Sequence, residues 1–308
     1  MTRLEIQDSI QGYGAPMYPS FSFSLYGELI KAKQTFLLMY TVAFAFLISA
    51  WPIGIILADF FWLLVGLFLA ISGSTMLNMY IDRDIDATMG RTRGRPLPSN
   101  RIRPSTVLFH GLAFSTAGIL VTGVFINPLT MTMVFLGCFF DVVIYSLWLK
   151  RRTRFSIIFG GIAGGLPAIA GRTAVTGALD IIGLLLGLFV LSWIPLHILS
   201  IALIPRNLEG YKNCNIPIWP VVKGEIQTYR VITISALLSS FIIIVLGILL
   251  KINPLAWLIL LVFCFFIFYQ AITNLKRPSN TRTYRIFKLA SLFMAFAFFW
   301  LFMGVAFS

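Results

Sequence analysis

The side chains best suited to chemistry in this sequence lie between residues 78 and 95. Asn78, Asp82 and Asp86 recur every four residues, so on one continuous helix they share a face, with successive side chains about 6 Å apart. Oxygen ligands at this spacing suit Mg²⁺, which proteins usually hold through one or two carboxylates, waters and substrate phosphate oxygens. Arg91 and Arg95 follow, and their planar guanidinium forks match phosphate geometry. The segment therefore predicts a magnesium-dependent diphosphate site, with a solvated, charge-balanced loop as the alternative.

Asp141 and two histidines stand in otherwise apolar surroundings. Asp141 lies inside a predicted membrane span, four residues before Tyr145 and one helical turn away from it. An intramembrane carboxylate is a functional candidate, and a structural hydrogen bond to a neighbouring helix is the alternative. His110 has no recognisable motif around it, so we expect a packed structural histidine, whereas His197 belongs to a longer motif described below.

Membrane helices must position these residues. Of the 308 residues, 58% are hydrophobic and only 11% are charged, with a mean hydropathy of +0.90, whereas a soluble domain carries about 25% charged residues. Charge-free stretches long enough to cross a bilayer recur along the chain, and Asn127-Pro128 divides the longest of them. We therefore predict an all-α integral membrane protein in which a cytoplasmic N-terminal arm, residues 1–34, precedes a single membrane domain, residues 35–308. Nine transmembrane helices are expected at about 35–57, 59–80, 104–126, 128–149, 155–175, 181–204, 230–250, 253–275 and 285–306.

The basic residues indicate the orientation of the chain. Lys and Arg number 24 against 11 Asp and Glu, and with a cytoplasmic N-terminus all of these basic residues except Arg172 and Lys251 lie in cytoplasmic segments. This bias predicts a multi-pass cell-membrane protein with its C-terminus outside, and it explains the net charge of +13 without nucleic acid. The long inner loops at 82–103 and 204–229 favour an active site on the cytoplasmic side. The three cysteines form no CxxC pair and the first 34 residues lack an apolar core, so we expect no zinc site, disulfide framework or secretory signal.

Several motifs in order resemble one family of membrane enzymes. N-x-x-x-D-x-x-x-D at 78–86, followed by R-T-x-x-R-P-L at 91–97, is similar to the first signature of the UbiA superfamily of membrane prenyltransferases, in its protoheme IX farnesyltransferase (heme O synthase) branch. The likeness continues in YGELIKAKQT (26–35), YSLWLKR (145–151), GGIAGGLPAIAG (160–171), WIPLH (193–197) and NIPIWPVVKG (215–224). The glycines at 160–165 are expected to allow close helix packing.

The resemblance implies a nine-helix bundle around a central cavity open to the cytoplasmic face. Its donor would be a polyprenyl diphosphate, its acceptor heme B in a lipid membrane, its cofactor Mg²⁺ and a heme A synthase a candidate partner. Carried over by position, the Mg²⁺ ligands are Asn78, Asp82 and Asp86, joined by Glu209 for a second ion. The diphosphate would be gripped by Arg91, Arg95, Lys150 and Arg151. Further substrate contacts are expected from Lys31, Asp141, Tyr145, His197, Tyr211 and Lys212.

His197 and Gly210 leave two questions open at this stage. An imidazole at His197 could ligate heme iron or position a propionate, and a hydrogen bond between helices is the alternative. Gly210 stands where the family usually has an acidic residue, so either one or two Mg²⁺ ions could bind. Ala32 likewise replaces the usual proline of the first helix.

Two other functions compete with this interpretation. A superfamily relative could prenylate a quinone-ring precursor or a glycerol-phosphate ether lipid, but Trp193 and His197 together with the N-I-P turn favour heme. A transporter would need polar residues along a path across the membrane, whereas the polar residues here gather on one side. The prenyl chain length and the oligomeric state are left open.

Overall fold

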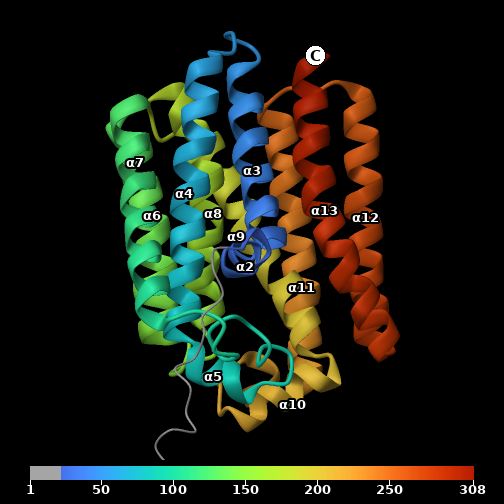
Figure 1. Cartoon of the computed structure of the whole chain (residues 1–308). Helices are drawn as coiled ribbons and strands as arrows, with labels where there is room; N and C mark the ends of the chain where they lie inside the picture. Colours follow the sequence, from blue (N-terminus) through green and yellow to red (C-terminus); the bar gives the residue numbers. More distant parts are fainter. Residues whose placement is uncertain (1–21) are drawn as a thin grey trace, which may run out of the picture.

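The protein is described by a computed structural model that covers residues 22–308, so most of the predicted N-terminal arm, residues 1–21, lies outside the described residues. Within the described range nine helices are long and apolar enough to cross a membrane, which confirms the predicted all-helical bundle. The short helices α5 (Arg83–Thr88) and α10 (Pro205–Asn213) lie at one end of the bundle, and the C-terminus lies at the other (Figure 1). The nine spans are α3 (Ala32–Ala50), α4 (Leu57–Ile81), α6 (Pro104–Phe125), α7 (Pro128–Cys138) with its continuation η1 (Phe139–Leu149), α8 (Ser156–Thr176), α9 (Ile181–Ala202), α11 (Trp219–Leu249), α12 (Pro254–Lys276) and α13 (Asn280–Ala306).

Most helix ends follow local sequence signals. Asn127 caps α7 by accepting a hydrogen bond from the backbone N–H of Thr130 at 2.7 Å, and Pro128 opens that helix, which confirms the predicted division. Helix α3 ends at Ala50 rather than at 57, because Pro52 cannot donate to a helix and the chain turns there. Helix α11 begins at Trp219 rather than 230, but Gly224, at φ 76° and ψ 174°, breaks its first turns.

The fourth span changes from an α-helix into a π-helix at Phe139, which the sequence did not lead us to expect. In a π-helix each N–H bonds to the carbonyl five residues earlier, as the backbone N–H of Lys150 does with the oxygen of Tyr145 at 2.8 Å. Side chains five residues apart therefore come close to the same face. The shift presents Asp141 and Ser146 together to helix α4.

Glycines bring the helices of the core close together. A Cβ added to Gly165 of α8 would lie 2.5 Å from the carbonyl oxygen of Gly187 in α9, so the two backbones touch there as the glycine-rich segment predicted. A Cβ on Gly160 would lie 3.0 Å from the ring of Tyr145, which occupies that space instead. The buried apolar side chains form two large clusters, and the central cavity has walls from both.

Candidate active site

A cavity of about 380 Å³ lies between the spanning helices and reaches the end of the bundle that carries α5 and α10. Toward this end its walls are polar and charged, and deeper in the bundle they become apolar. The polar lining residues include Lys31, Asp82, Asp86, Arg91, Arg95, Asp141, Tyr145, Lys150, His197 and Tyr211, and the apolar ones include Leu67, Met133, Val134, Val190 and Met294. A volume of this size is typical of a small-molecule site.

Of the three residues of the first motif, Asp82 and Asp86 line the cavity, whereas Asn78 is not among its lining residues. Helix α4 ends at Ile81, yet the backbone N–H of Asp82 bonds to Asn78 at 2.9 Å and that of Asp86 bonds to Asp82 at 2.8 Å. The helical hydrogen bonding thus passes through a small bend at Asp82 into α5. Asn78, Asp82 and Asp86 are all buried.

Each buried carboxylate of this motif is paired with a cation from elsewhere in the chain. Lys150, just after η1, donates through Nζ to Oδ2 of Asp82, and Arg95 donates through Nη1 to Oδ2 of Asp86 at 2.6 Å. Thr92 adds a hydrogen bond from its hydroxyl to the backbone oxygen of Asp86 at 3.0 Å. The loop after α5 is therefore tied back onto Asp86, while the end of η1 places Lys150 beside Asp82.

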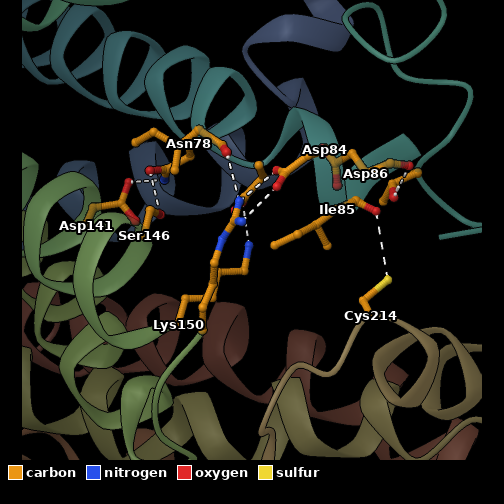
Figure 2. A network of polar contacts seen from close by, with 12 residues as sticks. Asn78, Asp84, Ile85, Asp86, Asp141, Ser146, Lys150 and Cys214 are labelled. Carbon is orange, nitrogen blue, oxygen red and sulfur yellow. Dashed lines mark hydrogen bonds and ion pairs between the residues drawn. The ribbon is translucent and has the colours of Figure 1, made fainter. Parts of the chain in front are cut away.

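Asn78 is clamped by the π-helix (Figure 2). Its Nδ2 donates to Oδ2 of Asp141 at 2.7 Å, while its Oδ1 accepts from the hydroxyl of Ser146 at 2.8 Å. Both ends of the amide are thereby fixed, and Oδ1 keeps a second lone pair. Asp141 contacts Asn78 in this way and lines the cavity alongside Tyr145.

Arg151, unlike the other predicted phosphate-binding cations, lies outside the cavity lining. It forms a bidentate ion pair with Asp84, at 2.7 Å to each carboxylate oxygen, and also donates to the backbone oxygen of Ile81 at 3.1 Å. This hydrogen bonding to Arg151 lowers the pKa of Asp84. Arg151 and Asp84 are exposed and do not line the cavity, whereas Arg91, Arg95 and Lys150 do. Sequence reasoning missed Asp84, although its place between two motif aspartates was a signal.

The two lysines that line the cavity, Lys31 and Lys150, have pKa values shifted in opposite directions. Burial, together with the nearby charges of Arg95 and Lys150, lowers the pKa of Lys31 to about 8. Burial also opposes the charge of Lys150, but neighbouring Tyr145 and Asp82 outweigh it and raise that pKa to about 12. Lys31 is held at φ 48° before α3, in the left-handed region that few non-glycine residues adopt. It is therefore a cation that can lose its proton near neutral pH.

The second of the two long polar loops, residues 204–229, contributes less to the cavity than the sequence led us to expect. Glu209 and Lys212 of α10 are exposed and line a separate cavity of about 410 Å³, together with Glu225. Tyr211 does reach the central cavity. Gly210 faces the first loop, since a Cβ there would lie 3.1 Å from the Cε of Met89. The structure therefore does not bring Glu209 to Asp82 and Asp86.

His197 lines the cavity and is stacked between two aromatic rings. Its ring centroid lies 4.7 Å from that of Trp193 and 4.7 Å from that of Phe287, both nearly parallel to it. The hydroxyl of Ser291 lies 3.3 Å from its Nδ1. His110, in contrast, lies outside the cavity lining and forms a hydrogen bond of 3.1 Å with the hydroxyl of Tyr26.

Comparison with known proteins identifies the family. A family model described as the UbiA prenyltransferase family matches residues 37–306. The chain belongs to the UbiA prenyltransferase family. A relative named protoheme IX farnesyltransferase from Archaeoglobus fulgidus is 35% identical over 287 residues, which is 90% of this chain and 96% of the relative. A protein of the same name from Korarchaeum cryptofilum is 35% identical over 85% of this chain and 87% of that protein.

Solved structures agree with this family fold. A structure of digeranylgeranylglyceryl phosphate synthase matches with a TM-score of 0.76 at 18% identity, covering 92% of this chain and 99% of that chain. A UbiA homologue from Archaeoglobus fulgidus, bound to DMAPP and Mg²⁺, matches with a TM-score of 0.65 at 14% identity, covering 90% of this chain and 98% of that chain. The nine-helix arrangement is thus that of UbiA prenyltransferases.

The acidic residues of this UbiA prenyltransferase fit a magnesium ion. Oδ1 of Asp82 is buried and has no hydrogen-bond partner in residues 22–308, an arrangement that costs free energy unless a ligand satisfies the atom. The described residues contain no group of three or more His, Cys, Asp and Glu side chains that could hold a metal. The two buried carboxylates that line the cavity, Asp82 and Asp86, leave room for waters and phosphate oxygens, as Mg²⁺ prefers.

Proposed function

We propose that this UbiA prenyltransferase is a protoheme IX farnesyltransferase. It transfers a polyprenyl group from an allylic diphosphate to a vinyl group of heme B, with addition of water, and gives a heme O-type hydroxyethyl-polyprenyl product. One observation carries the proposal: a single cavity combines charged residues suited to diphosphate and Mg²⁺ with apolar walls, and His197 in its lining is stacked between Trp193 and Phe287. The names of the relatives at 35% identity support it.

The charged end of the cavity supplies the residues for ionising the donor. Asp82 and Asp86, with Asn78 as a further candidate ligand, would hold Mg²⁺, and the bound ion would supply Lewis-acid polarisation of the diphosphate oxygens. Arg91, Arg95 and Lys150 bind the diphosphate and stabilise the charge that develops as the bond between its oxygen and C1 of the prenyl group breaks. Arg151 acts indirectly, because its ion pair with Asp84 supports the junction between α4 and α5.

The apolar end of the cavity supplies binding and shielding. Its aliphatic walls, such as Leu67, Met133 and Val134, suit a polyprenyl chain and keep bulk water from the allylic cation. His197 holds the heme so that a vinyl group faces C1, through iron or a propionate. Tyr145 and Tyr211 also line this cavity and are candidate substrate contacts.

The same proposal includes a cellular orientation. The loops that carry most of the basic residues lie at the end of the bundle with α5 and α10, and Arg172 and Lys251 belong to the opposite end. The positive-inside bias places the charged end of the cavity in the cytoplasm of a cell-membrane protein, with the N-terminus inside. Mg²⁺ and a soluble prenyl diphosphate headgroup are both accessible from that side.

His197→Ala tests the heme acceptor, with His110→Ala as the matched control outside the cavity. His197→Ala should weaken heme B binding and shift the Soret band of bound heme, while binding of the prenyl diphosphate stays close to that of the parent. His110→Ala should leave both unchanged. If the parent binds no heme saturably, the heme proposal fails and a quinone-type acceptor takes its place.

A second measurement identifies the product. Purified protein is incubated with heme B, Mg²⁺ and prenyl diphosphates of different lengths, and the mass of the product heme is measured by mass spectrometry. The expected product carries one prenyl group and one water. The preferred donor gives the prenyl length, and unchanged heme with every donor contradicts the proposal.

A further inference from the structure

Two cations that line the central cavity come from separate segments of the chain. Lys31 lies between α2 (Phe23–Leu29) and α3, and Arg95 lies in the loop after α5. The charge of Arg95 acts on Lys31, and like charges at this range repel each other. Contacts elsewhere in these two segments must therefore hold both side chains beside the cavity until a diphosphate neutralises them.

Arg101 lies beside the backbone that carries Arg95. Its Nη2 donates to the carbonyl oxygen of Gly94 at 2.8 Å, and its Nε donates to the hydroxyl of Ser99 at 3.0 Å. That hydroxyl donates in turn to the carbonyl oxygen of Arg95 at 2.6 Å. The peptide groups on both sides of the Arg95 Cα are therefore held by one guanidinium group, either directly or through Ser99.

The same guanidinium group also binds α2. Nη1 and Nη2 of Arg101 donate to the two carboxylate oxygens of Glu28, the first of them at 2.9 Å. The backbone carbonyl of Glu28 accepts a hydrogen bond from the N–H of Lys31 at 3.1 Å. Buried leucines of α2 and of the loop share one apolar cluster, which adds contact between the two segments. Arg101 thus connects the segment that carries Lys31 with the segment that carries Arg95.

These contacts leave Glu28 and Arg101 outside the central cavity. The two side chains are 42% and 38% exposed, and neither lines the cavity. An isolated exposed ion pair contributes little to folding stability, whereas a bidentate pair within a network fixes geometry. We therefore expect the network to act on the position of the two cations and not on the diphosphate directly.

We propose that Glu28 and Arg101 are positioning residues for the diphosphate of the donor. They hold the backbones that carry Lys31 and Arg95 in place, so binding of the diphosphate does not have to order the loop first. The effect falls on affinity, because a diphosphate that has already bound both cations holds the two segments itself. The inference rests on the proposed function, since it assigns both cations to the diphosphate, but the identity of the acceptor does not enter it.

Arg101→Gln tests the network, with Arg93→Gln as the matched control. A glutamine lacks the fork that bonds Glu28 and Gly94 together. Arg93 belongs to the same loop, is exposed and does not line the cavity, so both variants lose one positive charge from this loop. For each protein we measure steady-state kinetics, competitive inhibition by inorganic pyrophosphate with Mg²⁺, and the midpoint of thermal unfolding.

Arg101→Gln should raise the KM for the prenyl diphosphate about tenfold, while kcat at saturating donor stays within about twofold of the parent. The inhibition constant of pyrophosphate should rise by the same factor, because the hydrocarbon chain of the donor takes no part in the effect. The midpoint of thermal unfolding should not change. Arg93→Gln should resemble the parent in all three measurements.

Glu28→Gln tests the other end of the network and serves as the second variant if Arg101→Gln does not fold. It removes the carboxylate charge but keeps one acceptor oxygen, so KM for the donor should rise about threefold. The double variant should lose no more than Arg101→Gln alone, since both changes break one contact. A loss near thirtyfold would show that the two residues act separately and would contradict the shared role.

Three further results overturn the inference while the proposed function stands. A KM for Arg101→Gln like that of the parent means that the network does not position the cations. An equal rise in KM for Arg93→Gln means that only the net charge of the loop matters. A loss confined to kcat, with a lower midpoint of thermal unfolding, means that the network stabilises the fold. A parent protein that binds no prenyl diphosphate overturns the proposed function, and the inference with it.

Discussion

The two polar loops at the end of the bundle that carries α5 and α10, residues 82–103 and 204–229, both contain acidic and basic residues but have unlike surroundings. In the first loop, Asp82 and Asp86 are buried, each bonded to a cation, and both line the central cavity. In the second, Glu209 and Lys212 are exposed and line a different cavity. Charge alone therefore does not make a residue part of the site. Burial against a cation contributed by another segment distinguishes the first loop from the second.

Removing a carboxylate should have the largest effect on activity in the first loop and little effect in the second. Asp82→Ala or Asp86→Ala should lower kcat by about 100-fold or more, because each withdraws a proposed metal ligand and leaves a buried cation unpaired. Glu209→Ala, the matched change in the second loop, should stay close to the parent. Steady-state kinetics at saturating Mg²⁺ measure both, and an equal loss at Glu209 would show that the second loop also holds the metal.

Arg95→Lys tests whether the first loop needs the shape of its cation or only the charge. A lysine keeps the charge but loses the planar fork that can bond Asp86 and a phosphate together, so kcat/KM should fall about tenfold. Arg93→Lys is the control, because Arg93 is exposed and does not line the cavity. Equal kinetics for both variants would mean that Arg95 acts as a point charge.

Lys31, which lines the cavity together with residues of the first loop, should make the activity depend on pH. Its pKa of about 8 means that the free protein carries this charge below pH 8 and loses it as the pH rises through that value. If the ammonium binds the diphosphate, kcat/KM for the prenyl diphosphate should decline above pH 8. Lys31→Arg should abolish this decline, because arginine stays protonated. A pH–rate profile that declines identically in both proteins would assign the titration to another group.

Gly210→Asp should produce the smallest effect and make the second loop more like the first. The added carboxylate points toward Met89, whose flexible end at 3.1 Å can move aside, so the fold should persist. We expect the apparent Mg²⁺ requirement to fall slightly or stay unchanged, as measured by a metal titration of the rate. A large loss of activity would indicate that α10 needs glycine at this position.

The features that sequence could predict are those set by local periodicity and local caps. Nine apolar stretches predicted the nine spans of the described residues, and the four-residue spacing agrees with the helical hydrogen bonds that link Asn78, Asp82 and Asp86. The exposure of Glu209 could not be predicted, because the direction of a short helix such as α10 depends on what it packs against. The link between Asn78 and Asp141 depends on contacts across 63 residues and on a helix type that leaves no apolar pattern.

The π-helix Phe139–Leu149 makes the number of residues in this span as important as their identity. Each residue removed from this π-helix rotates everything beyond it by roughly a quarter of a turn around the axis. A deletion of one residue between Asp141 and Lys150 would therefore keep every named side chain in the sequence, yet swing Lys150 away from Asp82 while Asp141 stayed on Asn78. Among related sequences, a change in the length of this segment would mark a rebuilt site more clearly than many substitutions.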